Sequence, residues 1–565
     1  MKKLLLLAAA FLVTAGVIVS QPNLWKSWFE VPLTRDEASS ALRNLTPGID
    51  RIDAPVIRRA KLSLGNKADL KSTLPAITEF PLSVRGATSG NVVHAEIFAS
   101  SEKAGQGTDG WINEVAKQFN QARVKLADGR EASVSIRKIA SGTGYQFIAS
   151  GEHTPAAFSP SNHLWIAMAK AHGAQVAPVS ERLVGNSAGI VLRAGSAAAM
   201  RERYGELNVR NLLDAVVQGH LVMGYTDPFA SSTGLNFLVT VLAEFAGGDQ
   251  EAMLSDAVVS SFESFQQGVP FVALTTLQMR ESVQNEGSLD AFVMEYQTFV
   301  KTPELSSGYE FIAFGLLHDN PLYFTGEDTA QKAVIEAFAQ FAAQDKFVQL
   351  ASEYGFNAGP RHQSAYALPD GATLIKAQRL WKEKKDSGRP IAAVFLCDVS
   401  GSMRGTRLAN LRKALTAGAE FIASENSIGL VAFNNSVTTL LPIKRFNLPH
   451  KANFVAAVDA LRAGGNTAMY DGVAISLSML DEAVRATPDA KPILFVLSDG
   501  ATNRGLEYGD LAPIAAGLQI PIYTIGYAAK LSELKRLSSL VEAASLNADE
   551  AQIEYKIGAL LNAQM

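Results

Sequence analysis

Apolar runs suited to buried strands alternate with segments of helical periodicity along most of the 565-residue chain, and this alternation constrains the fold more than any other feature. The pattern is clear from "NVVHAEIFAS", which is typical of a strand, and continues with "DGWINEVAKQFNQA", whose apolar residues recur at helical spacing. Strands that alternate with helices usually lie parallel in a sheet with helices on both faces. The sequence therefore predicts an α/β protein.

The alternation is interrupted, which predicts more than one domain. Residues 91–365 form the first α/β region. Residues 390–565 form a second, doubly wound α/β domain, in which ligands sit beyond the carboxyl ends of the strands. Residues 366–389 are rich in lysine, glycine and proline and predict a solvated linker. Residues 21–90 have a weak pattern and predict a spacer that lifts the later domains off a membrane.

The N-terminus predicts export. Two lysines precede an apolar run from Leu4 to Val19, as in a secretory signal. Residues 1–20 are therefore expected to be either a cleaved signal peptide or an N-terminal hydrophobic helix that anchors the protein in the inner membrane, with the bulk on the periplasmic or extracytoplasmic side. The net charge of −4, with no strongly basic stretch, argues against nucleic acid as a partner.

A short polar loop follows the first strand of the C-terminal domain. In "FLCDVSGSMRG", Asp398, Ser400 and Ser402 occupy alternate positions, and residues two apart in an extended stretch point the same way. One carboxylate and two hydroxyls therefore converge. The preceding Cys397, the chain's one cysteine, is expected to be a buried structural residue.

Two further loops supply oxygen atoms of the same kind. Thr467 stands in a glycine-bounded loop before a helix, and Asp499 ends another apolar strand. All three loops can open on one edge of a parallel sheet, which would gather two carboxylates and three hydroxyls. Such a set suits Mg²⁺, or Mn²⁺ or Ca²⁺, and suits zinc poorly.

These residues carry a resemblance to the von Willebrand factor A domain, whose metal-ion-dependent adhesion site (MIDAS) follows the pattern D-x-S-x-S…T…D. The resemblance implies that Ser400, Ser402 and Thr467 lie nearest the metal and that Asp398 and Asp499 are direct or water-bridged ligands. It also implies a protein partner that offers an acidic residue to the cation. Asp471 is expected to be an ordinary helix-face residue or one that supports the ligands.

The middle region places small polar residues after strands and ahead of helices, where free N–H groups can bind oxyanions. The segments "IASGTGYQFIASGEHTPAAFSPSNHLW" and "TDPFASSTG" resemble bacterial extracellular solute-binding proteins of the two-lobed periplasmic type. Helix capping explains any single one of these residues equally well. The candidate pocket residues are Ser100, Ser101, Ser141, Thr143, Ser161, Asp227, Ser231, Ser232 and Thr233.

The motif "GNSAG" around Ser187 matches the G-x-S-x-G pattern of hydrolases, but the strand-like "IVLRAG" follows where a nucleophile elbow needs a helix. We therefore expect no enzyme. The sequence favours an exported, membrane-anchored binding protein that engages a protein partner through a divalent cation, with a solute-binding domain for a small solute or anion. The alternative is the substrate-binding component of an ABC-type importer.

Overall fold

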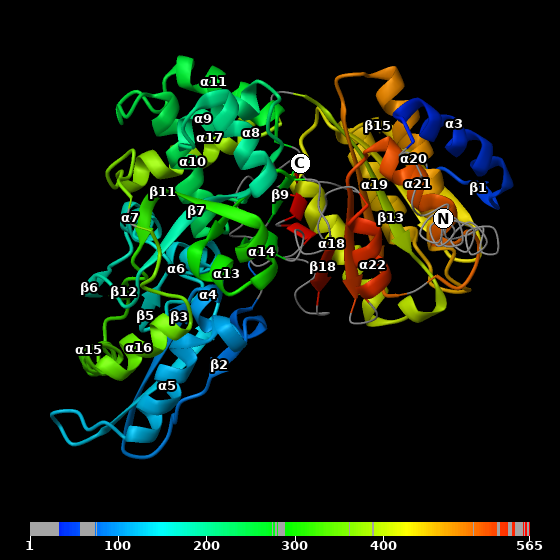
Figure 1. The fold of residues 1–565 in the computed structure, drawn as a ribbon. Coiled ribbons are helices and arrows are strands. Elements are labelled where there is room, and N and C mark those ends of the chain that lie inside the picture. The colour runs from blue at the N-terminus through cyan, green and yellow to red at the C-terminus, as the bar shows by residue number, and fades with distance from the viewer. Residues whose placement is uncertain are drawn as a thin grey trace, which may run out of the picture.

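The computed structural model describes residues 33–56 and 74–565, apart from residues 75, 270, 274, 277–278, 281–288, 361, 387–388, 501, 528–530, 541–544, 549–556, 559 and 562–563. The expected signal or anchor, residues 1–20, lies outside this part. Within it, no helix combines the length and the apolar character needed to cross a bilayer. The described strands form three sheets of seven, six and five strands, and helices pack on each of them (Figure 1).

The first lobe of the middle region is built on the six-stranded sheet. The strands, in spatial order, are β2 (Leu82–Val84), β4 (Glu131–Lys138), β3 (Val92–Ala99), β5 (Ala157–Ser159), β12 (Leu322–Phe324) and β6 (Ala177–Ser180). The helices of this lobe are α4 (Ser101–Ala104), α5 (Trp111–Ala122), α6 (Ser141–Ser150), α7 (Leu164–Ala171), α15 (Thr329–Ala342) and α16 (Asp345–Glu353).

The second lobe is built on the five-stranded sheet. Its strands, in spatial order, are β11 (Tyr309–His318), β7 (Asn186–Arg193), β10 (Ala291–Glu295), β8 (Met223–Thr226) and β9 (Phe271–Ala273). Its helices are α8 (Ala194–Tyr204), α9 (Val209–Val217), α10 (Ser232–Phe245), α11 (Asp256–Gln267), α13 (Tyr296–Val300) and α14 (Pro303–Gly308). The chain passes between the lobes from β6 to β7 and returns from β11 to β12.

The C-terminal domain is built on the seven-stranded sheet. Its strands, in spatial order, are β1 (Arg51–Asp53), β15 (Val437–Arg445), β14 (Ser427–Phe433), β13 (Ile391–Asp398), β16 (Lys491–Ser498), β17 (Ile522–Tyr527) and β18 (Ser545–Ala548). Its helices are α18 (Thr406–Gly418), α19 (Leu448–Ala460), α20 (Met469–Ala486), α21 (Tyr508–Leu518) and α22 (Leu531–Ser538). The pairs that β13 makes with β14 and β16 are parallel, as the alternating pattern predicts.

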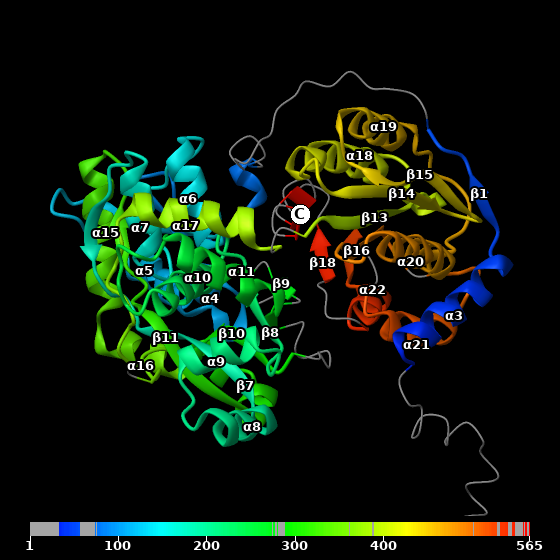
Figure 2. The ribbon, with the colours of Figure 1, turned by 90° about the horizontal axis from the view of Figure 1, so that it is seen from above.

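The expected spacer, residues 21–90, is wrong in part, because two of its segments belong to the C-terminal domain. Strand β1 pairs in parallel with β15 at the edge of the sheet, and α3 (Arg35–Leu45) packs along α21 and α20 (Figure 2). The buried hydroxyl of Ser39 donates to Asp481 Oδ2 at 2.6 Å. These contacts make the N-terminal segment part of the C-terminal domain.

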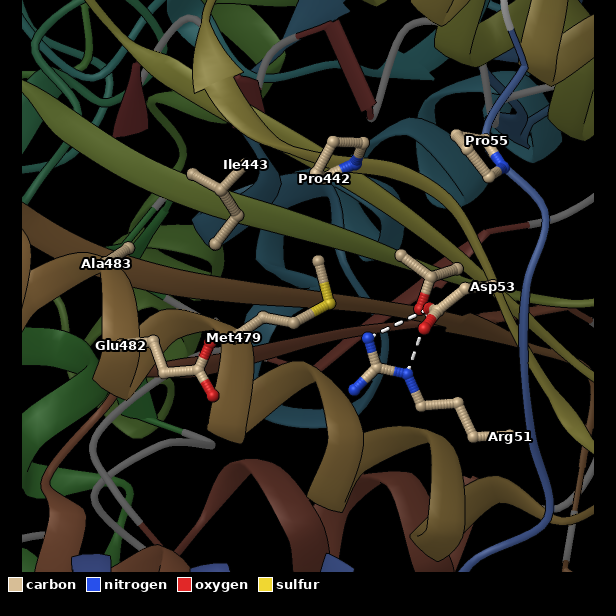
Figure 3. Close-up of a pocket in the computed structure, with 9 residues that line it drawn as sticks. Arg51, Asp53, Pro55, Pro442, Ile443, Met479, Glu482 and Ala483 are labelled. Atoms are coloured by element: carbon tan, nitrogen blue, oxygen red, sulfur yellow. Dashed lines mark hydrogen bonds and ion pairs between the residues drawn. The ribbon is translucent and has the colours of Figure 1, made fainter.

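Strand β1 also forms one wall of an open groove of about 470 Å³ (Figure 3). An ion pair of 2.9 Å between Arg51 and Asp53 lies at its rim. The remaining lining residues come from the segment after β1, from β15 and from α20, and are Pro55, Thr439, Pro442, Ile443, Met479, Glu482 and Ala483. The N-terminal segment thus supplies Arg51, Asp53 and Pro55 to the lining of the groove.

The expected solvated linker, residues 366–389, is also wrong, because it contains the packed helix α17 (Gly371–Lys384). Trp381 is fully buried, and its Nε1–H donates to the hydroxyl of Tyr225 at 2.6 Å. Of the lysines that suggested a solvated segment, Lys376 is exposed, whereas Lys385 is buried at the end of this helix.

The second lobe and the C-terminal domain share one hydrophobic core cluster. It includes Phe292 and Phe299 of the lobe together with Phe395 and Met565 of the domain. The side-chain amide of Gln564 donates to the carbonyl of Val272 at 2.9 Å across the same contact. In Figure 2, β9 and β18 lie on the sides of the two units that face each other.

Candidate metal centre and solute cleft

The predicted metal residues lie at the carboxyl edge of the C-terminal sheet. Asp398 is the last residue of β13, and Ser400 and Ser402 lie in the turn that follows it. Thr467 lies two residues before α20, and Asp499 directly follows β16. Since β13 and β16 are parallel neighbours, their ends bring these loops to one edge, as the sequence predicted.

Backbone hydrogen bonds join the three loops. The Gly401 N–H donates to the Gly465 carbonyl at 2.9 Å, which ties the first loop to the loop that carries Thr467. The Asn503 N–H donates to the Thr467 carbonyl at 3.0 Å, and the Thr467 N–H donates to Asn503 Oδ1 at 2.9 Å, which ties the second loop to the third. The geometry of the site is therefore fixed by the main chain.

The polar side chains form a continuous chain across the edge. The Ser400 N–H donates to Asp398 Oδ1 at 2.8 Å, the hydroxyl oxygens of Ser400 and Ser402 are 3.0 Å apart, and Ser402 Oγ donates to Asp499 Oδ1 at 2.9 Å. Four of the predicted residues thus contact one another, while Thr467 is held beside them by its backbone.

Asp398 is completely buried, and its second carboxylate oxygen accepts a hydrogen bond of 2.6 Å from the Ser498 hydroxyl. Burial raises the pKa of Asp398, and the nearby Asp499 carboxylate raises it further. A divalent cation would favour the ionised form that burial disfavours. Sequence reasoning missed Ser498, although its position beside Asp499 at the end of a strand could have revealed it.

Sequence reasoning also missed Arg407. Its guanidinium forms an ion pair of 2.6 Å with Asp499 Oδ2, while Oδ1 is engaged by Ser402. Nothing in the sequence marks this arginine, because it lies in the first turn of α18 and reaches Asp499 only through the fold.

The donor set fits a hard cation. In the described part of the chain, no group of three or more His, Cys, Asp or Glu side chains is placed to hold a metal, so serine and threonine oxygens would have to be ligands. Two carboxylates and three hydroxyls are oxygen donors that Mg²⁺ accepts and zinc does not favour. Asp471, in the first turn of α20, has a backbone partner, since its Oδ1 accepts the Leu506 N–H at 2.7 Å.

The predicted solute-pocket residues come together between the two lobes, and all of them are buried. Their exposed fractions are 1% for Ser100, 8% for Ser101, 4% for Ser141, 2% for Thr143, 0% for Ser161, 2% for Asp227, 5% for Ser231, 2% for Ser232 and 0% for Thr233. The Gly142 N–H donates to the Ala230 carbonyl at 3.1 Å, and Arg280 pairs with Asp109 at 3.3 Å, so the lobes are in direct contact.

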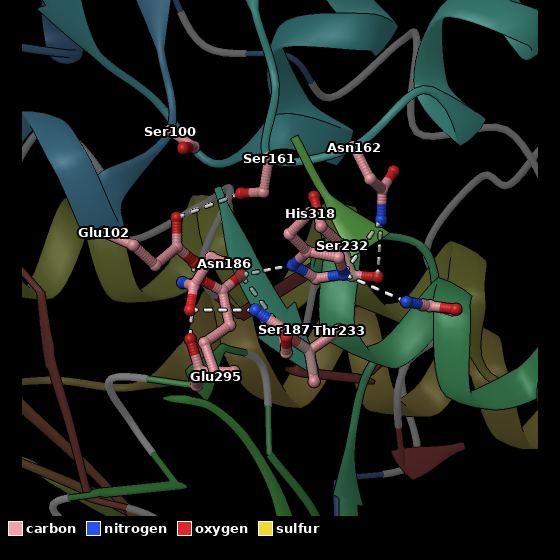
Figure 4. A network of polar contacts seen from close by, with 12 residues as sticks. Ser100, Glu102, Ser161, Asn162, Asn186, Ser187, Ser232, Thr233, Glu295 and His318 are labelled. Atoms are coloured by element: carbon pink, nitrogen blue, oxygen red, sulfur yellow. Dashed lines mark hydrogen bonds and ion pairs between the residues drawn. The ribbon is translucent and has the colours of Figure 1, made fainter. Parts of the chain in front are cut away.

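Several of these residues have structural partners. Ser231 caps α10 by accepting the Gly234 N–H, and Ser232 Oγ accepts the Trp165 indole N–H at 2.9 Å. Asp227 Oδ1 accepts the Phe229 N–H at 2.7 Å. Sequence reasoning missed Glu102, Glu295 and His318, which lie in the same contact region (Figure 4).

Ser187 is the second residue of β7. A nucleophile elbow needs a strand before the serine and a helix after it. Ser187 is instead followed by the rest of β7, so its surroundings differ from those of a nucleophile elbow. Cys397 is fully buried in β13, and burial raises the pKa of its thiol.

Two family models match the chain. Residues 104–357 match the bacterial extracellular solute-binding protein, and residues 393–555 match the von Willebrand factor type A domain. Inter-alpha-trypsin inhibitor heavy chain H3 of Bos taurus is 27% identical over 154 residues, which are 25% of this chain and 17% of the bovine protein. The uncharacterized protein sll0103 of Synechocystis sp. is 24% identical over 148 residues, 25% of this chain and 33% of that protein. The aligned part thus spans about a sixth to a third of the length of these relatives.

Solved structures are similar to each part at low identity. The sulfate-binding protein SubI from Mycobacterium tuberculosis H37Rv is 17% identical, with 51% of this chain and 91% of that chain covered and a TM-score of 0.35. A periplasmic thiamin binding protein is 12% identical, with 54% and 98% covered and a TM-score of 0.38. A von Willebrand factor type A protein from Catenulispora acidiphila is 19% identical, with 31% and 42% covered and a TM-score of 0.29.

The family matches agree with the two architectures and with the order in which they occur in the chain. Residues 104–357 therefore contain a bacterial extracellular solute-binding domain, and residues 393–555 contain a von Willebrand factor type A domain.

Proposed function

We propose that this protein is an exported binding protein that engages a protein partner through a divalent cation at the edge of its von Willebrand factor A domain. The observation that carries the proposal is the convergence of Asp398, Ser400, Ser402 and Asp499 in one hydrogen-bonded chain beside Thr467. The solute-binding domain holds a small solute between its lobes.

The residues of the site would have different roles in cation binding. Ser400, Ser402 and Thr467 would bind the cation through neutral oxygens, and Asp398 would hold it in place from its buried position. Asp499 is engaged by Ser402 and Arg407, which favours a water-bridged role for its carboxylate. The cation supplies positive charge that an acidic side chain of the partner can neutralise.

Titration calorimetry of the full chain tests the metal claim. Mg²⁺ or Mn²⁺ should bind to the wild type and lose most of its affinity in Asp398→Asn, which keeps the shape of the side chain. Asp489→Asn, at an exposed position of the same domain, is the matched control. Equal affinity in wild type and Asp398→Asn would disprove the metal site.

The partner claim needs a second experiment. Immobilised protein should retain a partner from envelope extract in Mg²⁺ and release it in chelator, and Asp398→Asn should retain none. A partner that stays bound in chelator would show that recognition does not pass through the cation.

A second candidate function is the substrate-binding component of an ABC-type importer. The match of residues 104–357 to extracellular solute-binding proteins favours it. Genes for a permease and an ATPase beside this one would support the importer, and their absence together with a cation-dependent partner would support the first proposal.

Export is part of both candidates. The inner-membrane anchor belongs to the first and is tested by fractionation of the cell envelope.

A further inference from the structure

Two buried carboxylates from opposite lobes lie where the two lobes of the solute-binding domain meet. Glu102 lies on α4 in the first lobe and is 7% exposed, and Glu295 ends β10 in the second lobe and is 1% exposed. The Thr276 hydroxyl of the second lobe donates to Glu102 Oε1 at 3.3 Å, so Glu102 reaches across the cleft. Figure 4 shows both carboxylates in one polar network.

Glu295 is well satisfied by its own lobe. Its Oε1 pairs with His318 Nδ1 at 2.9 Å and accepts a longer hydrogen bond of 3.4 Å from the Thr233 hydroxyl. Its Oε2 accepts a hydrogen bond of 2.7 Å from the Asn186 side-chain amide. This network holds the Glu295 carboxylate at a fixed position that faces the first lobe.

Glu102 is held by hydroxyl groups, of which one is the neighbouring Ser100 side chain. Its oxygens accept long hydrogen bonds from the hydroxyls of Ser161, at 3.4 Å, and Thr276, at 3.3 Å. None of the described residues forms an ion pair with it. The ammonium of Lys103 favours the ionised form of Glu102 through space, but the pKa of Glu102 is still raised. The cost of this buried carboxylate falls further when a cation or a proton arrives.

The neighbouring Lys103 stabilises the Glu102 carboxylate only in part. Its ammonium donates to Ser100 Oγ at 2.7 Å, to Asn320 Oδ1 at 3.0 Å and to the Pro160 carbonyl at 3.3 Å. These three acceptors account for the three donors of a lysine ammonium. Lys103 therefore fixes the loops of the first lobe and acts on Glu102 through its charge, while its three N–H donors are directed to other acceptors.

We propose that the cleft takes a small solute with a protonated amino or guanidino group, which donates to Glu102 and lies beside Glu295, and that it excludes oxyanions. This inference rests on the proposed solute-binding role of the middle domain and names the class of its ligand. An oxyanion at this position would be a third negative charge beside two buried carboxylates. A cation there would gain charge-assisted hydrogen bonds, which are roughly twice as strong as neutral ones.

Calorimetry and thermal unfolding of the full chain with defined probes test the proposal. The cationic probes are putrescine, agmatine and ethanolamine, and the anionic probes are sulfate, phosphate and molybdate. At least one cation should bind and raise the midpoint of unfolding, and no oxyanion should. Glu102→Gln, which keeps the shape and removes the charge, should weaken cation binding by about tenfold or more.

The control is Glu114→Gln, an exposed glutamate of α5 that pairs with Lys117, and it should bind the cations as the wild type does. Oxyanion binding by the wild type would overturn the proposal. Equal cation affinity in Glu102→Gln and wild type would also overturn it while leaving a solute-binding role elsewhere in the cleft. Binding of no probe of either charge would overturn the proposal and the solute-binding role together, whereas the metal site is measured independently with Mg²⁺.

Discussion

The guanidinium of Arg407 lies 2.6 Å from Oδ2 of Asp499, on the side of the carboxylate opposite the Ser402 hydroxyl. Asp499 is 6% exposed, so this ion pair neutralises a nearly buried charge without a metal. The arginine and a divalent cation would therefore compete for the same carboxylate.

Replacing Arg407 by glutamine should raise the affinity for Mg²⁺ by about tenfold, because a positive charge beside the cation is removed and Asp499 Oδ2 is freed. Titration calorimetry measures the change. Arg404→Gln removes a positive charge from an exposed position just before α18 and should have little effect on Mg²⁺ affinity. A drop in Mg²⁺ affinity in Arg407→Gln would mean that the arginine supports the site and does not compete with the cation.

Leu42→Ala should destabilise the von Willebrand factor A domain, although this residue lies far from the domain in the sequence. Leu42 is 1% exposed and belongs to the same core cluster as Leu511 and Leu518 of α21. The loss of a fully buried leucine costs about 2–4 kcal/mol. Calorimetry should show a lower midpoint for this domain, with Leu448→Ala, 44% exposed in the same domain, as the control. An unchanged midpoint would show that α3 does not contribute to the stability of the domain.

The sequence predicted the central strands and the convergence of the polar loops at one edge of the sheet, because both depend on local patterns. Strand β13 is buried along its whole length, and the polar loop after it follows directly from "DVSGS". Parallel pairing of β13 with β16 then brings Asp398 and Asp499 to one edge without further information.

The parts that were missed depend on contacts between remote segments. Strand β1 has three exposed residues and no apolar pattern, and only its pairing with β15 makes it a strand of this sheet. Helix α17 contains several lysines, and its buried side is defined by contacts such as that of Trp381 with Tyr225. Glu102 and Glu295 belong to different lobes, so only the contact between the lobes brings them near each other.

Asp227→Asn should stabilise the protein near neutral pH. Burial raises the pKa of Asp227 to about 6, although the ammonium groups of Lys382 and Lys385 oppose this rise. A carboxyl group with a raised pKa stabilises the fold below its unfolded pKa, near 4, and this contribution is lost as the pH rises through about 6. The loss amounts to about 3 kcal/mol at most for a shift of this size.

The variant avoids this loss because asparagine can still accept the Phe229 N–H. Urea unfolding at about pH 7 and about pH 4.5 should show a gain that shrinks at the lower pH. Asp249→Asn, at an exposed position, should show no such pH dependence. A gain of equal size at both pH values would indicate that the charge of Asp227 is not its cause.

Cation binding in the solute cleft should strengthen as the pH rises. Burial and the Glu295 carboxylate raise the pKa of Glu102, so a proton competes with the cation for this carboxylate at lower pH. Burial lowers the pKa of Lys103 to about 7, so this lysine, the other charged group beside Glu102, loses its positive charge over the same interval. His318 lies behind Glu295 and donates to it.

Both titrations act in the same direction, because each adds net negative charge to the cleft as protons leave. The affinity for putrescine should therefore increase from about pH 6 to about pH 8, and binding should release protons, which calorimetry in buffers of different ionisation enthalpy detects. Glu102→Gln should reduce the slope, since only the lysine then titrates. An affinity that falls over this range would contradict a site in which Glu102 binds the cation, because a carboxylate that loses its proton can only attract a cation more strongly.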